Sequence, residues 1–259
     1  MTNRTILEVN DISKNFDGYK VIDHISFNVS AGDNIGIIGP NGAGKSTLFN
    51  ILHGMLELDS GTISYNGNRI DRVPCHLRAR MGIGRLFQHI RIFREMTVLE
   101  NMFLGAITPP LETLRAALFQ RNLIKNHERQ QLEIVKNHLE TVGLEEKIDD
   151  PAKSLSIGQQ RLLAIARLLM ANSNILLLDE PIAGVSPVMA DKINLVIKNL
   201  ESIGKTVIVI EHDLTWIFEL CQEIIVMDQG RIVYRGTPKE LVSGDLLRDV
   251  FIEGSVKNA

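Results

Sequence analysis

The sequence is poor in cysteine. Its 259 residues include only two, Cys75 and Cys221, which are too few and too far apart along the chain to indicate a disulfide framework or a zinc site. We therefore expect a protein of a reducing compartment, in which both cysteines are small buried side chains.

Long apolar runs and a basic surplus are also absent. The opening MTNRTILEVNDISK contains no signal-peptide core, and no later segment approaches the roughly 20 consecutive apolar residues that span a bilayer. The net charge is -3 at pH 7, so no excess of basic residues exists to displace counterions from a nucleic acid. The sequence predicts a cytoplasmic chain that binds no nucleic acid and cannot cross a membrane by itself.

Apolar residues form 44% of the chain, enough for a sizeable core. In residues 7–38, short β-like runs are separated by Asp-Gly and Ala-Gly turn signals, which predicts an antiparallel β layer leading into a buried strand. Further on, NILLLDE and TVIVIEH are short apolar runs of the kind found in parallel strands that are buried on both faces, with the helical pattern of SPVMADKINLVIKNLESIG between them.

The middle of the chain has a different character. Residues 111–170 are rich in Leu, Gln, Glu, Lys and Arg. Apolar residues recur there at helical intervals up to Gly143, namely Leu132, Val135, Leu139 and Val142. The pattern predicts an amphipathic helical insertion into an α/β core.

The stretch GPNGAGKS, residues 39–46, fits the pattern G-x-x-x-x-G-K-S/T between a predicted strand and a predicted helix. Glycines allow successive backbone N–H groups to point at phosphate oxygens, the Lys45 ammonium attracts the β and γ phosphates, and the Ser46 hydroxyl can ligate Mg²⁺. We expect the phosphates to be bound by this loop and the start of its helix, at Gly39, Asn41, Gly42, Ala43, Gly44, Lys45, Ser46 and Thr47.

Two carboxylates follow the buried run ILLLDEP. Asp179 and Glu180 stand at the carboxyl end of a predicted strand, where α/β folds place their ligands. The expected roles are that Asp179 holds Mg²⁺ through water and that Glu180 polarises an attacking water molecule.

Three further motifs give a resemblance to a known family. LSIGQQ, residues 155–160, shortly precedes the Asp-Glu strand, Gln88 lies in RLFQHIRIF, and His212 closes VIVIEH. In this order, and together with the two motifs above, they resemble the ATP-binding cassette subunits of membrane transporters over nearly the whole chain. The resemblance implies an α/β fold with a P-loop NTPase (RecA-like) core, an N-terminal antiparallel β layer and an inserted α-helical subdomain.

The resemblance also implies an ATPase that uses ATP and Mg²⁺ and releases ADP and phosphate. Phe16 matches the aromatic residue that stacks on adenine. Gln88 matches the glutamine that touches Mg²⁺ and the attacking water and begins the contact with the membrane subunit, and His212 matches the histidine that contacts the γ-phosphate.

The LSIGQ motif implies that two cassettes pair. If Ser156 opens a helix, the first N–H groups of that helix form an anion site. In the family this site, here Ser156, Gly158 and Gln159, closes over ATP held by a second cassette, in a homodimer or a paralogous heterodimer.

Two positions depart from the commonest pattern. Ile157 replaces a frequent glycine, so we expect negative φ there, and Ser186 replaces an aspartate of the dimer seam.

Local features narrow the kind of transporter. GIGRLFQHIRIFREMTVLENM and the tail GTPKELVSGDLLRDVFIEG are most similar to cassettes of branched-chain amino acid uptake systems and their amide and urea relatives. Lipopolysaccharide-exporting cassettes are a close sister group and stay open as an alternative. Soluble cassettes of DNA repair or translation are disfavoured, since the chain has neither a long coiled-coil insertion nor a second cassette. A GTPase or small-molecule kinase is disfavoured because no Asn-Lys-x-Asp occurs.

The resemblance implies one cassette over residues 1–259, with the catalytic core and β layer in 1–87 and 171–259 and the helical subdomain with the LSIGQ motif in 88–170. Its implied partners are transmembrane permease subunits, a second cassette and, indirectly, a periplasmic or extracellular substrate-binding protein. Its implied place is the inner face of the cell membrane, as a peripheral protein.

The segment after Gln88 is unusually apolar for a loop. Ile90, Ile92, Phe93 and Met96 lie within seven residues of one another. Our hypothesis is that they line a groove for a short helix of the membrane subunit, and the alternative is that they pack inside the helical insertion.

Overall fold

The computed structural model describes residues 4–106 and 121–243, with side chains for all of these except 121–128. The chain forms two compact units, which we describe separately. The first contains Met1–Gln88, Asn174–Pro181 and Ile197–Ala259, and the second contains His89–Ser173 and Ile182–Val196. The beginning of the predicted helical insertion and the end of the tail lie outside the described residues.

An antiparallel sheet of four strands opens the first unit. It consists of β1 (Thr5–Phe16), β2 (Tyr19–Ser30), β4 (Ser60–Tyr65) and β5 (Asn68–Arg69), in the order β2-β1-β4-β5. The turn between β4 and β5 is Asn66-Gly67, with φ 49° and 76°, as two-residue hairpin turns require. The predicted β layer is confirmed.

The second sheet of this unit has six strands. They are β3 (Asn34–Ile38), β6 (Ile83–Leu86), β7 (Ile175–Asp179), β8 (Thr206–Ile210), β9 (Glu223–Asp228) and β10 (Arg231–Gly236), in the order β10-β9-β3-β8-β7-β6. All neighbours pair in parallel except β10, which pairs with β9 in antiparallel fashion. Every residue of β3, β7 and β8 is buried, which confirms the interpretation of their apolar runs as strands covered on both faces.

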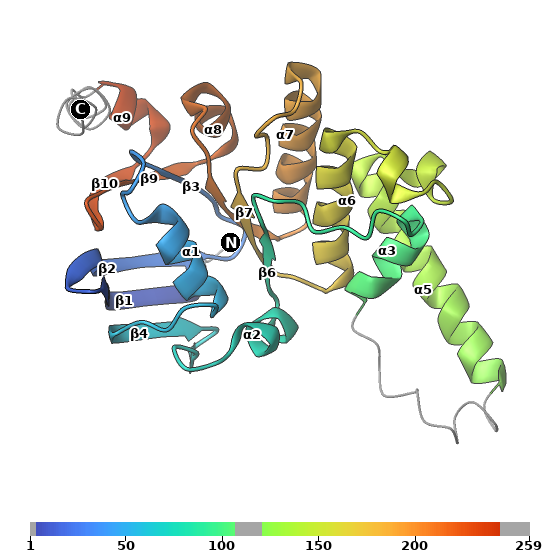
Figure 1. Cartoon of the computed structure of the whole chain (residues 1–259), viewed down its shortest axis with the longest axis horizontal. Helices are drawn as coiled ribbons and strands as arrows, with labels where there is room; N and C mark the ends of the chain where they lie inside the picture. The colour runs from blue at the N-terminus through green and yellow to red at the C-terminus, as the bar shows by residue number, and fades with distance from the viewer. Residues whose placement is uncertain (1–3, 107–120, 244–259) are drawn as a thin grey trace. The chain divides into compact units, whose positions relative to one another are not determined.

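Helix α1 (Lys45–His53) lies between the two sheets (Figure 1). Its buried residues Leu48, Phe49, Ile51 and Leu52 join side chains of both sheets in one hydrophobic core. The described part of this unit also contains α2 (Cys75–Met81), α8 (Leu214–Leu220), α9 (Pro238–Ser243) and the end of α7 (Pro187–Ser202). The core therefore fixes α1 and the loop before it against both layers.

A buried arginine fastens the far end of α1. Arg78 of α2 is 1% exposed, and its guanidinium donates hydrogen bonds to backbone carbonyls only. Two of these belong to the last turn of α1, where helix carbonyls have no partner within the helix. The acceptors are the carbonyl oxygens of Ile51 (2.7 Å), Leu52 (2.9 Å), Ile70 (2.7 Å), Asp71 (3.2 Å) and Val73 (2.8 Å).

Replacing Arg78 by Met should lower the free energy of unfolding by at least about 3 kcal/mol, because buried carbonyls that lose a charged donor each cost about 1–3 kcal/mol. Urea unfolding followed by circular dichroism measures the loss. The matched control is Arg80→Met, since Arg80 lies on the same helix and is exposed. Equal stability of the two variants would contradict the anchoring role of Arg78.

The second unit is helical in its described part. It contains α3 (Val98–Gly105), α5 (Arg121–Val142), the short 3-10 helices η1 (Glu145–Lys147) and η2 (Ala152–Ser154), α6 (Ile157–Met170) and the first turns of α7 (Pro187–Ser202). Helices α3 and α5 both pack on α6. Val135, Leu139 and Val142 of α5 are fully buried and the helix ends before Gly143 at φ 64°, as the helical intervals predict.

The division of the chain differs in detail from the boundary expected at residue 170. Residues 171–173 and 182–196 group with the helical unit and not with the catalytic core. The reason is local packing: a Cβ at Gly158 of α6 would lie 2.0 Å from Cγ of Met189, so the two helix starts touch. Within the described ranges, no helix combines the length and apolar content that a bilayer span needs.

Candidate functional site

The loop between β3 and α1 is shaped by close backbone contacts. A Cβ at Gly39 would lie 2.1 Å from the Met227 carbonyl oxygen, and one at Gly44, where φ is 97°, would lie 2.6 Å from the Val21 carbonyl oxygen. Both glycines are therefore required by the fold. Gly42 differs, because φ is 82° and nothing lies within 4 Å of the position a Cβ would take. The loop backbone is thus open to a ligand at Gly42.

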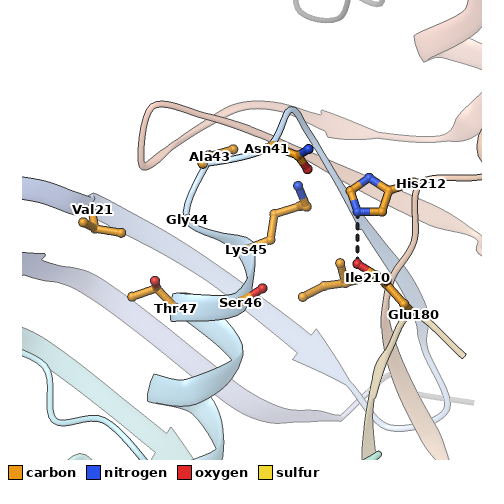
Figure 2. A pocket seen from close by; sticks show the side chains of 11 residues that line it. Val21, Asn41, Ala43, Gly44, Lys45, Ser46, Thr47, Glu180, Ile210 and His212 are labelled. Carbon is orange, nitrogen blue, oxygen red and sulfur yellow. Dashed lines mark hydrogen bonds and ion pairs between the residues drawn. The ribbon is translucent and has the colours of Figure 1, made fainter. Parts of the chain in front are cut away.

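A cavity of about 210 Å³ lies against this loop (Figure 2). It brings together the predicted phosphate loop, one carboxylate from the end of β7 and one histidine from beyond β8. Its lining residues are Val21, Asn41, Gly42, Ala43, Gly44, Lys45, Ser46, Thr47, Glu180, Ile210 and His212. The carboxyl ends of the parallel strands meet here, which is where α/β sheets bind ligands.

Lys45 is the cation of the cavity. Its side chain points into the space under the loop (Figure 2), and its ammonium donates to the carbonyl oxygens of Gly39 (2.7 Å) and Pro40 (2.8 Å). Burial lowers the pKa of Lys45 below its usual range, and the negative charges of Glu180 and Asp179 oppose that shift. A buried ammonium close to the N-terminal N–H groups of α1 suits the phosphates of a nucleotide.

Glu180 is held by the other two predicted catalytic residues. Gln88 Nε2 donates to Glu180 Oε2 at 2.8 Å. His212 Nε2 lies 3.1 Å from Glu180 Oε1 (Figure 2). The backbone of Glu180 is left-handed, with φ 49°, a conformation that is uncommon for residues other than glycine, asparagine and aspartate. A carboxylate in the wall of this cavity has the chemistry of a general base.

One detail of the sequence interpretation is wrong. His212 was expected to end the strand VIVIEH, but β8 ends at Ile210 and His212 lies two residues beyond it. The chain leaves the sheet early because Asp213 caps α8, with its carboxylate accepting from the Trp216 N–H at 3.0 Å. His212 is therefore a loop residue, and its side chain is about half exposed.

The residues expected to hold Mg²⁺ form a sparse set. Asp179 ends β7 and is 6% exposed, whereas Ser46 is exposed in the first turn of α1. In the part of the chain that the structure describes, no group of three His, Cys, Asp or Glu could hold a metal by itself. One hydroxyl and one carboxylate suit Mg²⁺, which usually takes its other ligands from water and nucleotide phosphates.

Phe16 does not line the cavity. It ends β1 beside the turn Asp17-Gly18, its side chain is 43% exposed, and the Lys14 ammonium lies 5.7 Å from its ring. The stacking on adenine implied by the resemblance stays a prediction. Sequence reasoning missed Val21 and Ile210, both of which line the cavity. Ile210 could have been selected as the last residue of a buried parallel strand.

The LSIGQ motif lies in the second unit. Ser156 is the N-cap of α6 and forms a capping box, in which Gln159 N–H donates to Ser156 Oγ at 3.3 Å and Ser156 N–H donates to Gln159 Oε1 at 2.9 Å. This confirms that Ser156 opens the helix. Gly158 is buried against Met189. Ile157 is 55% exposed with negative φ, as expected for a β-branched residue.

The sequence matches a known protein family and is similar to known transport proteins. Residues 22–183 match the family described as ABC transporter. The chain is 37% identical over 239 residues to the high-affinity branched-chain amino acid transport ATP-binding protein BraF of Pseudomonas aeruginosa, covering 92% of this chain and 94% of BraF. It is 32% identical over 246 residues to the lipopolysaccharide export system ATP-binding protein LptB of Escherichia coli, covering 95% of this chain and 96% of LptB.

A solved structure extends the likeness to three dimensions. The fold is similar to the ADP conformation of MJ1267, an ATP-binding cassette of an ABC transporter, with a TM-score of 0.82 and 33% identity over 96% of this chain and 98% of that one. The likeness therefore covers whole cassettes and is not limited to the phosphate loop.

Proposed function

We propose that this chain powers the uptake of branched-chain or other hydrophobic amino acids, or of related amides. The premise is that the chain belongs to the ABC transporter family and is an ATP-hydrolysing cassette. The observation that supports the ATPase chemistry best is the Glu180 carboxylate between Gln88 and His212 at the phosphate loop. The similarity to BraF supports the substrate class.

We assign the nucleotide contacts to the cavity and its surroundings. The phosphates are held by the open backbone at Gly42 and by Lys45, and the adenine is stacked on Phe16. Mg²⁺, when bound, neutralises phosphate charge and is held by Ser46, Asp179 and Gln88. The other phosphate-binding positions are Gly39, Asn41, Ala43, Gly44 and Thr47.

Hydrolysis is assigned to the Glu180 group. Glu180 accepts a proton from the attacking water, and the hydrogen bonds from Gln88 and His212 fix its carboxylate in place. His212, at the mouth of the cavity, is the side chain that contacts the γ-phosphate. Because these contacts fix the carboxylate, little reorganisation is needed for the reaction.

We further propose that two cassettes share each nucleotide. We assign the contact to Ser156, Gly158 and Gln159 at the N-terminus of α6, because the partial positive charge of this helix end suits an anion. In the proposed dimer this end of α6 closes over ATP bound to the second cassette. The homodimer and the heterodimer with a paralogous cassette both satisfy this arrangement.

The proposed partners place the chain at the cytoplasmic face of the cell membrane, as a peripheral subunit on transmembrane permeases. A periplasmic or extracellular substrate-binding protein would deliver the amino acid to the permeases. Similarity to LptB keeps lipid export as the alternative. Uptake of labelled leucine by cells that lack only this chain tests the two: loss of uptake supports our proposal, and intact uptake with lost lipopolysaccharide transport supports export.

The apolar segment after Gln88 is our proposed permease contact. Phe93 and Met96 are 50% and 37% exposed, so these two do not pack inside the helical unit. Buried Asn101 fixes the segment: its side chain accepts from the Phe93 N–H at 2.9 Å and donates to the carbonyl oxygens of Phe93 and Thr97, both at 2.9 Å. The Arg167 guanidinium lies 5.6 Å from the Phe93 ring. A rigid, exposed apolar segment suits a docking helix.

Replacing Phe93 by Ala should weaken assembly with the permeases by on the order of 10-fold or more, because a buried aromatic anchor is worth about 2 kcal/mol. ATP affinity of the isolated cassette should not change. Co-purification with the permeases and ATP titration measure the two effects. The control is Ile134→Ala, an apolar residue of α5 that is 41% exposed. Normal transport by the Phe93 variant in a reconstituted complex would count against the groove.

A further inference from the structure

Strand β6 carries a charged residue in its buried interior. Arg85 precedes Gln88 by three residues, every residue of β6 is buried, and the Arg85 side chain is 5% exposed. A buried guanidinium on this edge strand of the sheet requires strong partners, since its desolvation is costly. The stretch IGRLF gave this signal in the sequence, as an arginine between apolar strand residues.

The two terminal nitrogens of Arg85 bridge two elements of the site. Nη2 donates to Asp179 Oδ2 at 2.8 Å, and Nη1 donates to Asn50 Oδ1 at 2.6 Å. Asp179 ends β7 and Asn50 belongs to α1, the helix that starts with Lys45 and Ser46. The Arg85 guanidinium is therefore tied at once to the expected metal carboxylate and to the phosphate-binding helix.

Two aromatic rings hold the guanidinium from its other sides. Its central carbon lies 4.9 Å from the ring of Phe87 and 5.6 Å from that of Phe49. Such contacts stabilise a desolvated cation and restrict its rotation. Phe87 directly precedes Gln88, so the same guanidinium also contacts the segment that carries a residue of the hydrolysis group.

Stability alone does not account for this arrangement. A buried ion pair is seldom more stable than apolar residues of the same volume. The third nitrogen, Arg85 Nε, is buried without a hydrogen-bond partner among the described residues. The position of the guanidinium thus gives hydrogen bonds to its two terminal nitrogens and leaves Nε without one.

We propose that Arg85 is a positioning residue. Its guanidinium fixes, through Oδ2, the Asp179 carboxylate that would hold Mg²⁺. The inference rests on the proposed function, in which Asp179 holds Mg²⁺. Asn50 accepts a hydrogen bond from the other terminal nitrogen of Arg85. The Asp179 carboxylate is therefore held at a fixed position relative to α1, the helix that carries Ser46. Outer partners of this kind typically change metal affinity 10- to 100-fold when they are replaced.

The test is Arg85→Lys, which keeps a counter-charge for buried Asp179 but cannot bridge Asn50 and Asp179 together. ADP binding is measured by calorimetry in EDTA and at increasing Mg²⁺. In EDTA, the variant should bind ADP with the same affinity as the wild type. Mg²⁺ should still increase ADP affinity, but the Mg²⁺ concentration that gives half of this increase should rise at least about 10-fold. Asn50→Ala should raise that concentration by a smaller factor, and exposed Arg72→Lys should not change it.

The wild type and Asp179→Asn distinguish failure of the proposed metal site from failure of the proposed role of Arg85. If the wild type gains no ADP affinity from Mg²⁺, or if Asp179→Asn keeps the full gain, the proposed metal site itself is wrong. If both behave as expected while Arg85→Lys and Asn50→Ala titrate with Mg²⁺ like the wild type, or bind it more tightly, the positioning role is overturned. Thermal unfolding of each variant verifies that a weakened titration belongs to a folded protein.

Discussion

Glu180→Gln should slow ATP hydrolysis by at least about 100-fold while ATP still binds, as expected for loss of a general base. The substitution changes little else, because glutamine has the same shape and keeps one oxygen to accept from Gln88 Nε2. Its NH₂ group can donate to His212 Nε2 when the imidazole carries its proton on Nδ1, at the place where Glu180 Oε1 lies 3.1 Å away. The cavity should therefore keep its form and lose only its proton acceptor.

Steady-state phosphate release and nucleotide titration measure these two quantities. With Mg-ATP, size-exclusion chromatography should also show the Glu180 variant accumulating as a dimer, since the bound γ-phosphate persists. Glu219→Gln is the matched control, because Glu219 is an exposed glutamate of α8. Turnover of the Glu180 variant at the wild-type rate would remove this residue from the mechanism.

The second large effect concerns Lys45 and Ser156, which should fail in different ways. Lys45→Ala removes the buried cation at the phosphate loop and should abolish ATP binding, and with it ATP-driven dimerisation. Ser156→Arg adds bulk at the start of α6, at an exposed residue that is not among those lining the cavity. It should leave ATP bound to a monomer.

Equilibrium ATP titration and light scattering distinguish these outcomes, and the wild type should both bind ATP and dimerise. The shared-nucleotide arrangement would be contradicted if Ser156→Arg lost nucleotide affinity in the monomer as completely as Lys45→Ala. The LSIGQ motif would then serve the nucleotide of its own chain.

Much of the fold follows from local signals in the sequence. The buried strands β3, β7 and β8 appear as short apolar runs, and Asn66-Gly67 appears as a hairpin turn. Helix ends are set by nearby residues as well, at Ser156 and at Gly143. These features need only a few neighbouring residues, so periodicity and turn chemistry predict them.

Features made by distant contacts were missed. Arg85 and Asp179 are 94 positions apart, and the pocket wall at Val21 comes from the antiparallel sheet. The grouping of residues 182–196 with the helical unit depends on the contact between Gly158 and Met189. No local pattern encodes such pairs, because they arise only when the topology brings separate elements together.

At Glu180, the left-handed backbone makes the residue that favours stability different from the residue that the proposed hydrolysis needs. A side chain in this conformation costs about 1–3 kcal/mol, which glycine would not, so drift under selection for stability alone would favour glycine at this position. In the proposed mechanism, a glutamate with φ 49° directly after a buried strand therefore keeps its carboxylate at a cost in stability. In a duplicated copy that no longer transports, this position should be among the first to decay.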